Sequence, residues 1–311
     1  MTSSYAVHGL WCAMLTPLAR DGGVDPARFA RHAHWLLAHG VDGVAPFGTT
    51  GEGQSFSVAE RTGGLEALLA GAVAADRIIA ATGAAALTDT IALTRHSVQS
   101  GCTRCLVLPP FFFNDVSDDG LYAWYARVIE AVADPRLRLF LYHIPQVSGT
   151  ALSVDLVARL AGAFPGVIGG VKDSAGDWAN TSALLARAPQ LAILVGHEPH
   201  LPRLIRAGGA GTICGVANVF PALVRALMSP DVTVADEERI ATFIEIAFRQ
   251  PFLPAFKSIV AERTGDPGWR AVRPPLVDLA DDARQRLEDA LARVGMPVIP
   301  DAARADRSAV P

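Results

Sequence analysis

The sequence predicts one α/β domain of the (β/α)8, or TIM-barrel, class with helices appended at its C-terminal end. Eight short apolar runs alternate with helical patterns over about 220 residues, without a break in composition. The runs are continuously apolar, as strands of a parallel sheet covered on both faces are. A doubly wound sheet would place a glycine-rich phosphate loop after its first strand, whereas Thr16-Pro17-Leu18 stands there. The expected strands are Leu10–Leu15, Gly43–Pro46, Ile78–Ala81, Cys105–Leu108, Leu139–His143, Val167–Val171, Ala192–Val195 and Thr212–Gly215.

Capping residues mark where the expected helices begin and end. Asp25 precedes Pro26, which suits the first position of a helix, and Ser57 with Glu60 forms a capping box. The other expected caps are Thr88, Ser117 and Ser153 at N-termini, and Gly40, Gly101 and Gly208 at C-termini.

The part of the chain after Phe220 has helical patterns without convincing strands between them. We therefore expect a barrel over residues 1–225 and a helical region packed on it over residues 226–296. The polar, Ala/Arg-rich segment 297–311 is expected to be a flexible tail. The helical patterns of the second region are Val234–Phe248, Pro254–Thr264 and Asp281–Val294.

Composition excludes several classes of protein. Half of the 311 residues are hydrophobic and 19% are charged, which is unlike a disordered chain. The 27 basic residues do not exceed the 31 acidic ones, so no nucleic-acid partner is indicated. No apolar run reaches the ~18 residues of a membrane span, and the first residues lack the basic and apolar regions of a signal peptide. We expect a cytoplasmic protein without a membrane partner.

The four cysteines are expected to be reduced core residues. Cys102 and Cys105 form an isolated C-x-x-C pair that leads into an apolar run. A zinc site would need further ligands at suitable spacing, and a thioredoxin-like pair would open a helix. The other two cysteines are Cys12 and Cys214.

Lysine is nearly absent, since Lys172 and Lys257 are the only two among the 27 basic residues. Lys172 directly follows the sixth expected strand, and active sites of TIM barrels lie at this end of the strands. Burial favours the neutral amine, which attacks carbonyl carbons as a guanidinium does not. The ordinary alternative is an ion pair with Asp173. Lys257 is expected on a helix surface or at an interface.

Two further groups could complete a Schiff-base site. Tyr142 lies near the end of the fifth expected strand, one strand before Lys172, and a phenol can act as a general acid and base. The alternative is an aromatic residue that caps the barrel. Gly48-Thr49-Thr50-Gly51-Glu52 follows the second strand, where small residues, hydroxyls and successive N–H groups can form a nest for an anion. The alternative is an ordinary turn.

Together these motifs resemble the dihydrodipicolinate synthase / N-acetylneuraminate lyase family in order, spacing and strand position. The resemblance covers roughly residues 8–295. The motifs are Gly48–Glu52, Tyr142-His143-Ile144-Pro145 with Gly149, Gly170–Ser174, Gly196 with Glu198, Ala207–Gly211 and Ala217-Asn218.

The resemblance implies a class I aldolase that needs no metal or organic cofactor and forms a homotetramer or dimer. Lys172 would form an imine with pyruvate or another small 2-keto acid. Tyr142 would move protons, with Thr49 as the relay hydroxyl. Thr50 would hold the substrate carboxylate, while Gly48 lets the backbone approach it and Ile213 lies against the pyruvyl end.

Departures from the family pattern bear on the substrate. Val147 stands where dihydrodipicolinate synthases carry an arginine that grips a carboxylate, a contact worth ~1.5–3 kcal/mol. Phe112 or Phe113 stands where those enzymes borrow a tyrosine from a neighbouring subunit. Glu198 occupies the place of an acid that binds sugar hydroxyls in the lyases, and the histidines that could add hydrogen bonds are His143 and His197.

The favoured hypothesis is therefore a Schiff-base lyase that reversibly cleaves a 2-keto-3-deoxy sugar acid to pyruvate and an aldehyde. The same enamine could instead expel hydroxide or an amine, in a dehydratase or deaminase. A third alternative is 4-hydroxy-tetrahydrodipicolinate (dihydrodipicolinate) synthase itself. A fourth is a catalytically dead barrel that serves as a ligand sensor or scaffold.

Overall fold

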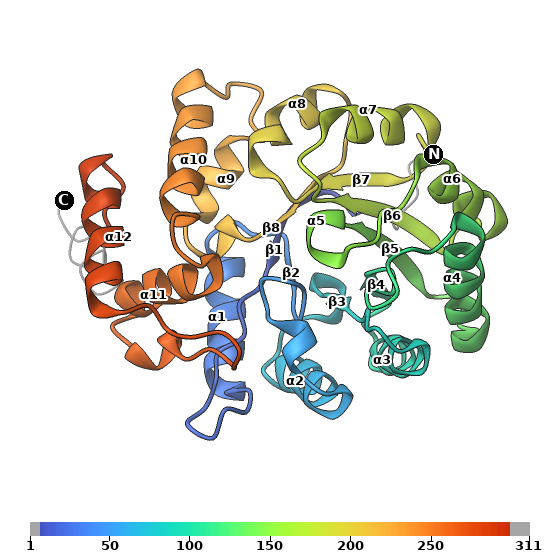
Figure 1. The fold of residues 1–311 in the computed structure, drawn as a ribbon, viewed down its shortest axis with the longest axis horizontal. Coiled ribbons are helices and arrows are strands. Elements are labelled where there is room, and N and C mark those ends of the chain that lie inside the picture. Colours follow the sequence, from blue (N-terminus) through green and yellow to red (C-terminus); the bar gives the residue numbers. More distant parts are fainter. Residues whose placement is uncertain (1–6, 299–311) are drawn as a thin grey trace.

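Eight parallel strands form a barrel in the computed structural model, which describes residues 7–298 (Figure 1). Neighbouring strands pair in the order β2-β1-β8-β7-β6-β5-β4-β3, and a parallel bridge between Val44 and Ile78 joins the two end strands. The predicted strands are confirmed, with ends that differ by no more than two residues. They are β1 (Gly9–Ala13), β2 (Gly43–Ala45), β3 (Ile79–Ala81), β4 (Arg104–Val107), β5 (Arg138–His143), β6 (Ile168–Asp173), β7 (Ala192–Val195) and β8 (Gly211–Cys214).

Helices follow the strands and surround the barrel, as Figure 1 shows. The predicted caps Asp25, Ser57, Ser117 and Ser153 each accept a backbone N–H at the start of a helix. These interactions fix the points at which the chain turns from loop to helix. The helices are α1 (Pro26–Ala38), α2 (Val58–Ala70), α3 (Leu87–Gln99), α4 (Asp118–Val132), the short α5 (Pro145–Ser148), α6 (Val154–Ala163), α7 (Trp178–Arg187) and α8 (Leu201–Arg206).

The predicted cap at Thr88 is wrong. Helix α3 begins at Leu87, and the preceding Ala86 has no side chain that could cap it. Its first turn is tied instead by Thr90, whose hydroxyl accepts the Ala84 N–H at 2.9 Å and donates to the Ala84 carbonyl at 3.2 Å. Several hydroxyls stand close together here, and the sequence does not reveal which of them meets the loop backbone.

Two hydrophobic clusters hold the barrel together. One lies between the strands and the surrounding helices, and it includes the four cysteines, which are all buried and free. The other fills the barrel interior, with Trp11, Phe140 and Ile213 among its members. Gly170 makes room for the Phe140 ring and the Ala192 carbonyl oxygen, since a Cβ at this position would lie 2.8 Å from the Phe140 Cε1 and 2.3 Å from that oxygen. This packing explains the glycines that precede Lys172.

The C-terminal helices lie to one side of the barrel, at the left of Figure 1. Arg263 donates to the Asn218 carbonyl at 2.7 Å, and Arg273 donates to the Ser55 carbonyl at 2.7 Å, so both tie this region to loops that follow barrel strands. The three predicted helical segments are found, while residues 299–311 of the predicted tail lie outside the described residues. The helices are α9 (Pro221–Ala226), α10 (Val234–Ala247), α11 (Phe252–Thr264) and α12 (Asp281–Arg293).

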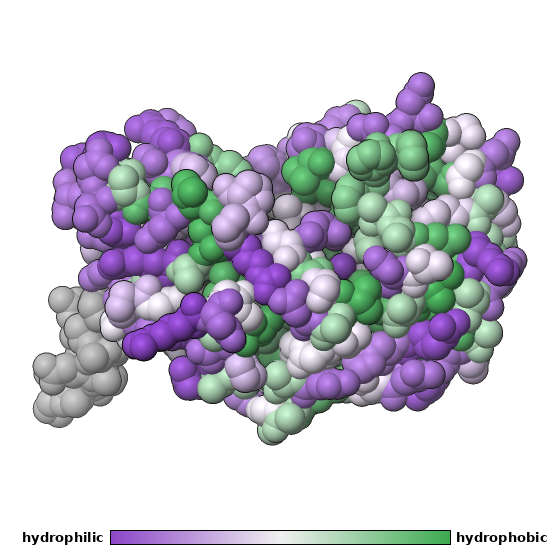
Figure 2. Space-filling view, turned by 60° about the horizontal axis from the view of Figure 1, so that its bottom comes forward, coloured by the Kyte–Doolittle hydropathy of each residue, from purple (hydrophilic) through white to green (hydrophobic). Residues whose placement is uncertain are grey.

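The surface is mixed in character. Figure 2 shows hydrophobic side chains in separate patches among hydrophilic ones on the face that it presents. Within residues 7–298, no helix combines the length and the apolar character that crossing a membrane requires.

Candidate active site

Two neighbouring strands place Lys172 and Tyr142 side by side. The two residues are register partners in the pairing of β5 with β6, and paired residues of parallel strands point to the same face. The Lys172 Nζ lies 4.1 Å from the centroid of the Tyr142 ring. The exposed fractions of the two residues are 3% and 2%. A buried amine and a phenol therefore meet at the end of the barrel where the strands finish.

Small residues leave space for the lysine side chain. A Cβ added at Gly196, which directly follows β7, would lie 3.0 Å from the Lys172 Cε and 2.0 Å from the Ser174 Oγ. The glycine of the Gly196-His197-Glu198 segment is thus required because the lysine stem passes directly over this backbone.

Asp173 does not pair with Lys172. Successive side chains of a strand point to opposite faces, so Asp173 lies on the other side of β6. Its carboxylate accepts hydrogen bonds from the Ala175 N–H at 3.0 Å, from Asn180 at 2.9 Å and from Thr181 at 2.8 Å. The structure gives Lys172 no carboxylate partner within residues 7–298, so the ion-pair alternative for this lysine is not supported.

The loop after β2 brings two threonines to the same place. Thr49 Oγ1 lies 3.2 Å from the Tyr142 hydroxyl, within hydrogen-bonding distance. Thr50 is buried, and both threonines line the cavity that contains Lys172. Two residues of the predicted anion nest therefore line the same cavity as Lys172.

This loop is bracketed by two residues in the left-handed backbone region, Phe47 with φ 59° and Glu52 with φ 54°. Such conformations cost roughly 1–3 kcal/mol each outside glycine and persist only when the surroundings enforce them. Gly53 is part of this enforcement, because a Cβ there would lie 1.7 Å from the Phe47 carbonyl oxygen. The Thr49–Thr50 segment is therefore held rigidly from both ends.

A cavity of about 430 Å³ opens above Lys172. This volume lies within the usual range of small-molecule sites. One wall is polar and comes from loops that follow β5, β6 and β7, while a second wall comes from α10, α11 and the segment between them and is apolar apart from Glu245. The polar wall contains Gln146, Ser174, His197 and Glu198, and the apolar wall contains Ile244, Phe248, Phe252 and Phe256.

Glu198 is the acid of the polar wall. It lies at the start of the 3-10 turn Glu198–His200, is buried, and accepts the Val216 N–H at 3.1 Å. Burial raises the pKa of its carboxyl group, an effect that the positive charge of Lys172 partly offsets. Burial also lowers the pKa of the neighbouring His197. Both groups thus favour their neutral forms more than they would in water, as suits hydrogen bonding to uncharged groups of a ligand.

Sequence reasoning missed Ser174. Ser174 lines the cavity, and its hydroxyl oxygen is screened from solvent and has no hydrogen-bond partner among the described residues. A signal was present, because Ser174 follows Lys172 by two residues and a strand directs such residues to one face. Sequence reasoning also missed the whole apolar wall, because it depends on how the C-terminal helices pack.

The remaining predicted residues divide into two groups. Ile213 and Val147 line the cavity, and 62% of Val147 is exposed at its rim. Gly48 and His143 do not line it. His143 points away from Tyr142, and its Nδ1 accepts the Leu152 N–H at 3.0 Å. The Gly48 carbonyl accepts the Gly53 N–H at 3.0 Å, so this residue contributes to the form of the loop.

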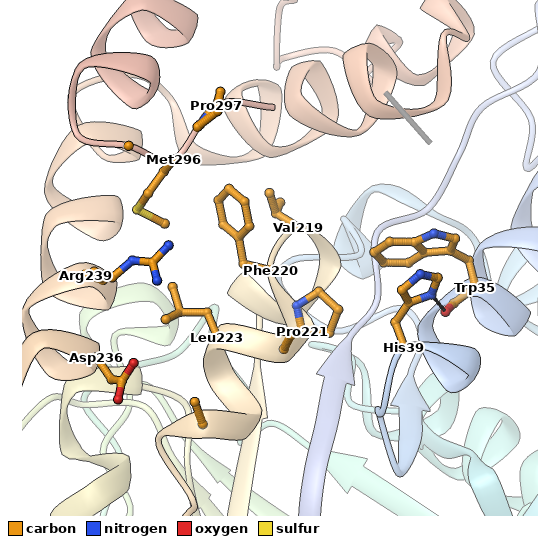
Figure 3. A pocket seen from close by; sticks show the side chains of 13 residues that line it. Trp35, His39, Val219, Phe220, Pro221, Leu223, Asp236, Arg239, Met296 and Pro297 are labelled. Carbon is orange, nitrogen blue, oxygen red and sulfur yellow. Dashed lines mark hydrogen bonds between the residues drawn. The ribbon is translucent and has the colours of Figure 1, made fainter. Parts of the chain in front are cut away.

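A second cavity of about 440 Å³ lies away from these groups (Figure 3). It is formed by the end of α1, α9, α10 and the residues after α12. His39 donates to the Trp35 carbonyl at 2.7 Å, and Asp236 accepts from Thr233 at the start of α10. Its ionisable groups are thus largely engaged in local structure. Within residues 7–298, no three His, Cys, Asp or Glu side chains converge as metal ligands.

Known proteins are similar to this chain in sequence and in fold. The model of the dihydrodipicolinate synthetase family matches residues 6–294. A DapA-like lyase of Chloroflexus aurantiacus, described as uncharacterised, is 36% identical over 92% of this chain and 97% of its own. The crystal structure of dihydrodipicolinate synthase from Agrobacterium tumefaciens has a TM-score of 0.87 and 39% identity over 92% of this chain and 99% of its own.

A further solved structure contains pyruvate. It is the dihydrodipicolinate synthase of Acinetobacter baumannii, with a TM-score of 0.83 and 29% identity, and the match covers 94% of this chain and 100% of that one.

Proposed function

We propose a function that starts from the family of this chain, which belongs to the dihydrodipicolinate synthetase family and is a lyase of the class I aldolase type. In this proposal Lys172 is the residue that forms the imine. The observation that carries the proposal is a buried amine that has no carboxylate partner in the described part of the chain. It lies 4.1 Å from the centroid of a tyrosine ring and opens to a cavity of substrate size. The pyruvate complex of the Acinetobacter baumannii relative supports a small 2-keto acid as the substrate.

The proposed reaction starts when the neutral amine of Lys172 attacks the C2 carbonyl carbon of the 2-keto acid. Loss of water from the carbinolamine gives an iminium ion, which accepts the electron pair of the C3–C4 bond as that bond breaks. Tyr142 donates its proton to the hydroxyl that leaves the carbinolamine as water, and the resulting phenolate takes the proton of the C4 hydroxyl as the aldehyde leaves. The enamine is then protonated at C3, and hydrolysis of the imine releases pyruvate and restores the amine.

Thr49 and Thr50 have separate functions in this proposal. The Thr49 hydroxyl, 3.2 Å from the phenol oxygen, relays protons to and from Tyr142. Thr50 and the adjoining backbone N–H groups bind the substrate carboxylate.

The polar wall supports a hydroxylated aldehyde portion, and hence a 2-keto-3-deoxy sugar acid as the substrate. Ser174 offers a hydroxyl without a partner, and Glu198 and His197 add further hydrogen-bonding groups. The lining of the cavity includes no arginine that could bind a second carboxylate. These features favour an aldehyde that carries hydroxyl groups over one that carries an acid.

A panel of 2-keto-3-deoxy sugar acids, scored for the release of pyruvate, tests this function. We expect turnover of at least one member and no turnover in the Lys172→Arg variant. An unchanged carbon skeleton in the product would indicate the dehydratase or deaminase alternative. Absence of any reaction in the whole panel would contradict the proposed substrate class.

The relatives favour a second candidate, since the Agrobacterium tumefaciens and Acinetobacter baumannii proteins are described as dihydrodipicolinate synthases. Val147 in place of a carboxylate-binding arginine counts against this activity here. Incubation with pyruvate and aspartate semialdehyde distinguishes the candidates, and we expect no product above the uncatalysed rate.

We also propose that the protein is a homo-oligomer. Phe112 and Phe113 follow β4, with 76% and 74% of their surface exposed in the single chain. Their rings meet edge to face at 5.1 Å. Association of two chains would remove this apolar surface from water. Sedimentation of the purified protein tests this, and a monomer at micromolar concentration would contradict it.

A further inference from the structure

The second lysine of the chain, Lys257, is completely buried. It lies in α11, its side chain is 0% exposed, and its ammonium forms an ion pair with Glu52, whose side chain is also 0% exposed. The ammonium also donates to the Ala271 carbonyl at 2.7 Å. Removing two charges from water is costly, so this pair calls for an explanation in terms of what it holds in place.

Glu52 is the last residue of the substrate loop, which we define as Gly48–Glu52. Its backbone has φ 54°, a conformation that favours glycine. A glycine would relieve the strain but would lack the carboxylate. That carboxylate is used twice, because it pairs with Lys257 and accepts the Arg273 N–H at 3.1 Å. The strained conformation is therefore maintained by contacts with the C-terminal region.

A continuous series of contacts leads from this ion pair to the reactive amine. The Glu52 N–H donates to the Thr49 carbonyl at 3.1 Å. The Thr49 hydroxyl contacts the Tyr142 hydroxyl at 3.2 Å, and the Tyr142 ring contacts Lys172. A displacement of Glu52 would thus move Thr49 and, with it, the neighbouring Thr50.

We propose that Lys257 is a positioning residue for substrate binding: through Glu52 it holds the substrate loop in the conformation that receives the 2-keto acid carboxylate. The inference rests on the proposed function and adds a residue that never touches the substrate. It makes α11 part of the active site, because the ion pair of Lys257 with Glu52 acts together with the packing of Gly53 against Phe47 in fixing the geometry of Thr49 and Thr50.

A purely structural role for this pair makes a different prediction. If the pair only joins α11 to the barrel, its removal lowers the stability of the fold and leaves binding of the keto acid unchanged. If the pair positions the loop, its removal weakens binding even where the protein is fully folded. The concentration of pyruvate that gives half-maximal trapping of Lys172 by borohydride measures this binding, without knowledge of the aldehyde.

The main variant is Glu52→Gln with Lys257→Met, which removes both charges with little change in volume and so avoids an unpaired buried charge. We expect the half-saturating pyruvate concentration to rise about tenfold or more, while the trapped fraction at saturation stays near that of the wild type. Tenfold corresponds to about 1.4 kcal/mol of lost binding free energy. A variant that keeps Glu52 and carries only Lys257→Arg has both charges and should recover part of the lost binding of pyruvate.

The matched control removes another ion pair between the C-terminal region and the barrel. Arg28 and Asp266 pair at 2.8 Å, and neither lines the cavity. Arg28→Gln with Asp266→Asn should lower thermal stability and leave the half-saturating concentration unchanged.

An unchanged half-saturating concentration in the folded double variant would overturn the positioning role and leave the proposed function intact. Absence of trapping in the wild type would overturn both. If the double variant does not fold, Lys257→Arg serves as the second variant, since it keeps both charges of the pair and changes only its geometry. A raised half-saturating concentration in that variant would support the positioning role, and an unchanged one would overturn it.

Discussion

The two lysines of this chain are both buried, but their surroundings differ. Lys257 has a carboxylate partner and a carbonyl acceptor, and its ammonium is held as a structural charge. Lys172 has an aromatic ring, a glycine and a cavity around it, and no carboxylate partner within residues 7–298. A buried amine can act as a nucleophile where a cavity admits a carbonyl compound to it. The contrast shows that burial alone does not identify a reactive lysine.

Lys172→Arg should have the largest effect on activity, and it tests most clearly whether the two lysines differ in function. Arginine keeps the charge but cannot form an imine, so we expect the rate of pyruvate release to fall by at least about 10⁴-fold. Pyruvate release from a substrate identified in the panel is the measurement. Lys257→Arg is the matched control, and it should raise the half-saturating substrate concentration while the rate at saturation is retained. Full activity of Lys172→Arg would exclude imine chemistry.

Tyr142→Phe should reduce kcat by about 10² to 10⁴-fold, because a positioned general acid and base typically contributes this much. The ring and its contact with Lys172 remain, so the variant removes only the hydroxyl. Thr49→Val removes the other half of the 3.2 Å contact and should have a smaller effect in the same assay. An equal loss in both variants at the upper end of this range would assign the proton transfer to the pair rather than to the phenol.

For stability the order is reversed: replacing Lys257 should destabilise the protein more than replacing Lys172. Lys257→Met leaves the Glu52 carboxylate buried without its partner, and we expect a loss of about 3–5 kcal/mol in the free energy of unfolding. Lys172→Met removes a buried amine that has no carboxylate partner, so it should be neutral or stabilising. Urea denaturation of both variants checks this. Equal losses would mean that the two amines have equivalent surroundings.

The smallest expected effect concerns the stability contributed by Glu198, which lines the same cavity as Lys172. Burial raises the pKa of its carboxyl group, so the folded state binds this proton more readily than the unfolded chain does. Stability must then fall as the pH rises from the unfolded value, about 4.3, through the raised folded value. Glu198→Gln removes this cost.

The Glu198→Gln variant should be more stable than the wild type at pH 7 by up to about 1 kcal/mol, and the difference should vanish below about pH 4. Thermal unfolding of the two proteins across this pH range is the measurement. A difference that grows as the pH falls would contradict the sign of the shift.

Much of the fold followed from the sequence, because parallel strands and helix caps leave local patterns. The positions of Lys172 and Tyr142 at the ends of neighbouring strands were enough to predict that they meet at the barrel mouth. From the sequence we expected Lys257 on a helix surface or at an interface, and the structure shows that its side chain is completely buried. No local pattern could reveal this burial, because its partner Glu52 lies more than 200 positions away in the chain.

Packing between distant segments and alternation along a strand account for the other differences. The apolar wall, with Phe248 and Phe252, depends on how α10 and α11 pack against the barrel. His143 shares a predicted motif with Tyr142, but alternation along the strand directs it to the loop at Leu152 and not to the cavity. Residue type and spacing identified the chemistry, whereas the shape of the substrate site depended on packing between distant segments.

The most direct test of the account is to trap the imine with pyruvate and borohydride, digest the protein and locate the adduct by mass spectrometry. The chain offers two lysines, so the assignment is unambiguous. We predict the reduced pyruvyl adduct on Lys172 and none on Lys257. An adduct on Lys257, or none on Lys172 at saturating pyruvate, would contradict the central claim that the unpaired buried amine is the nucleophile.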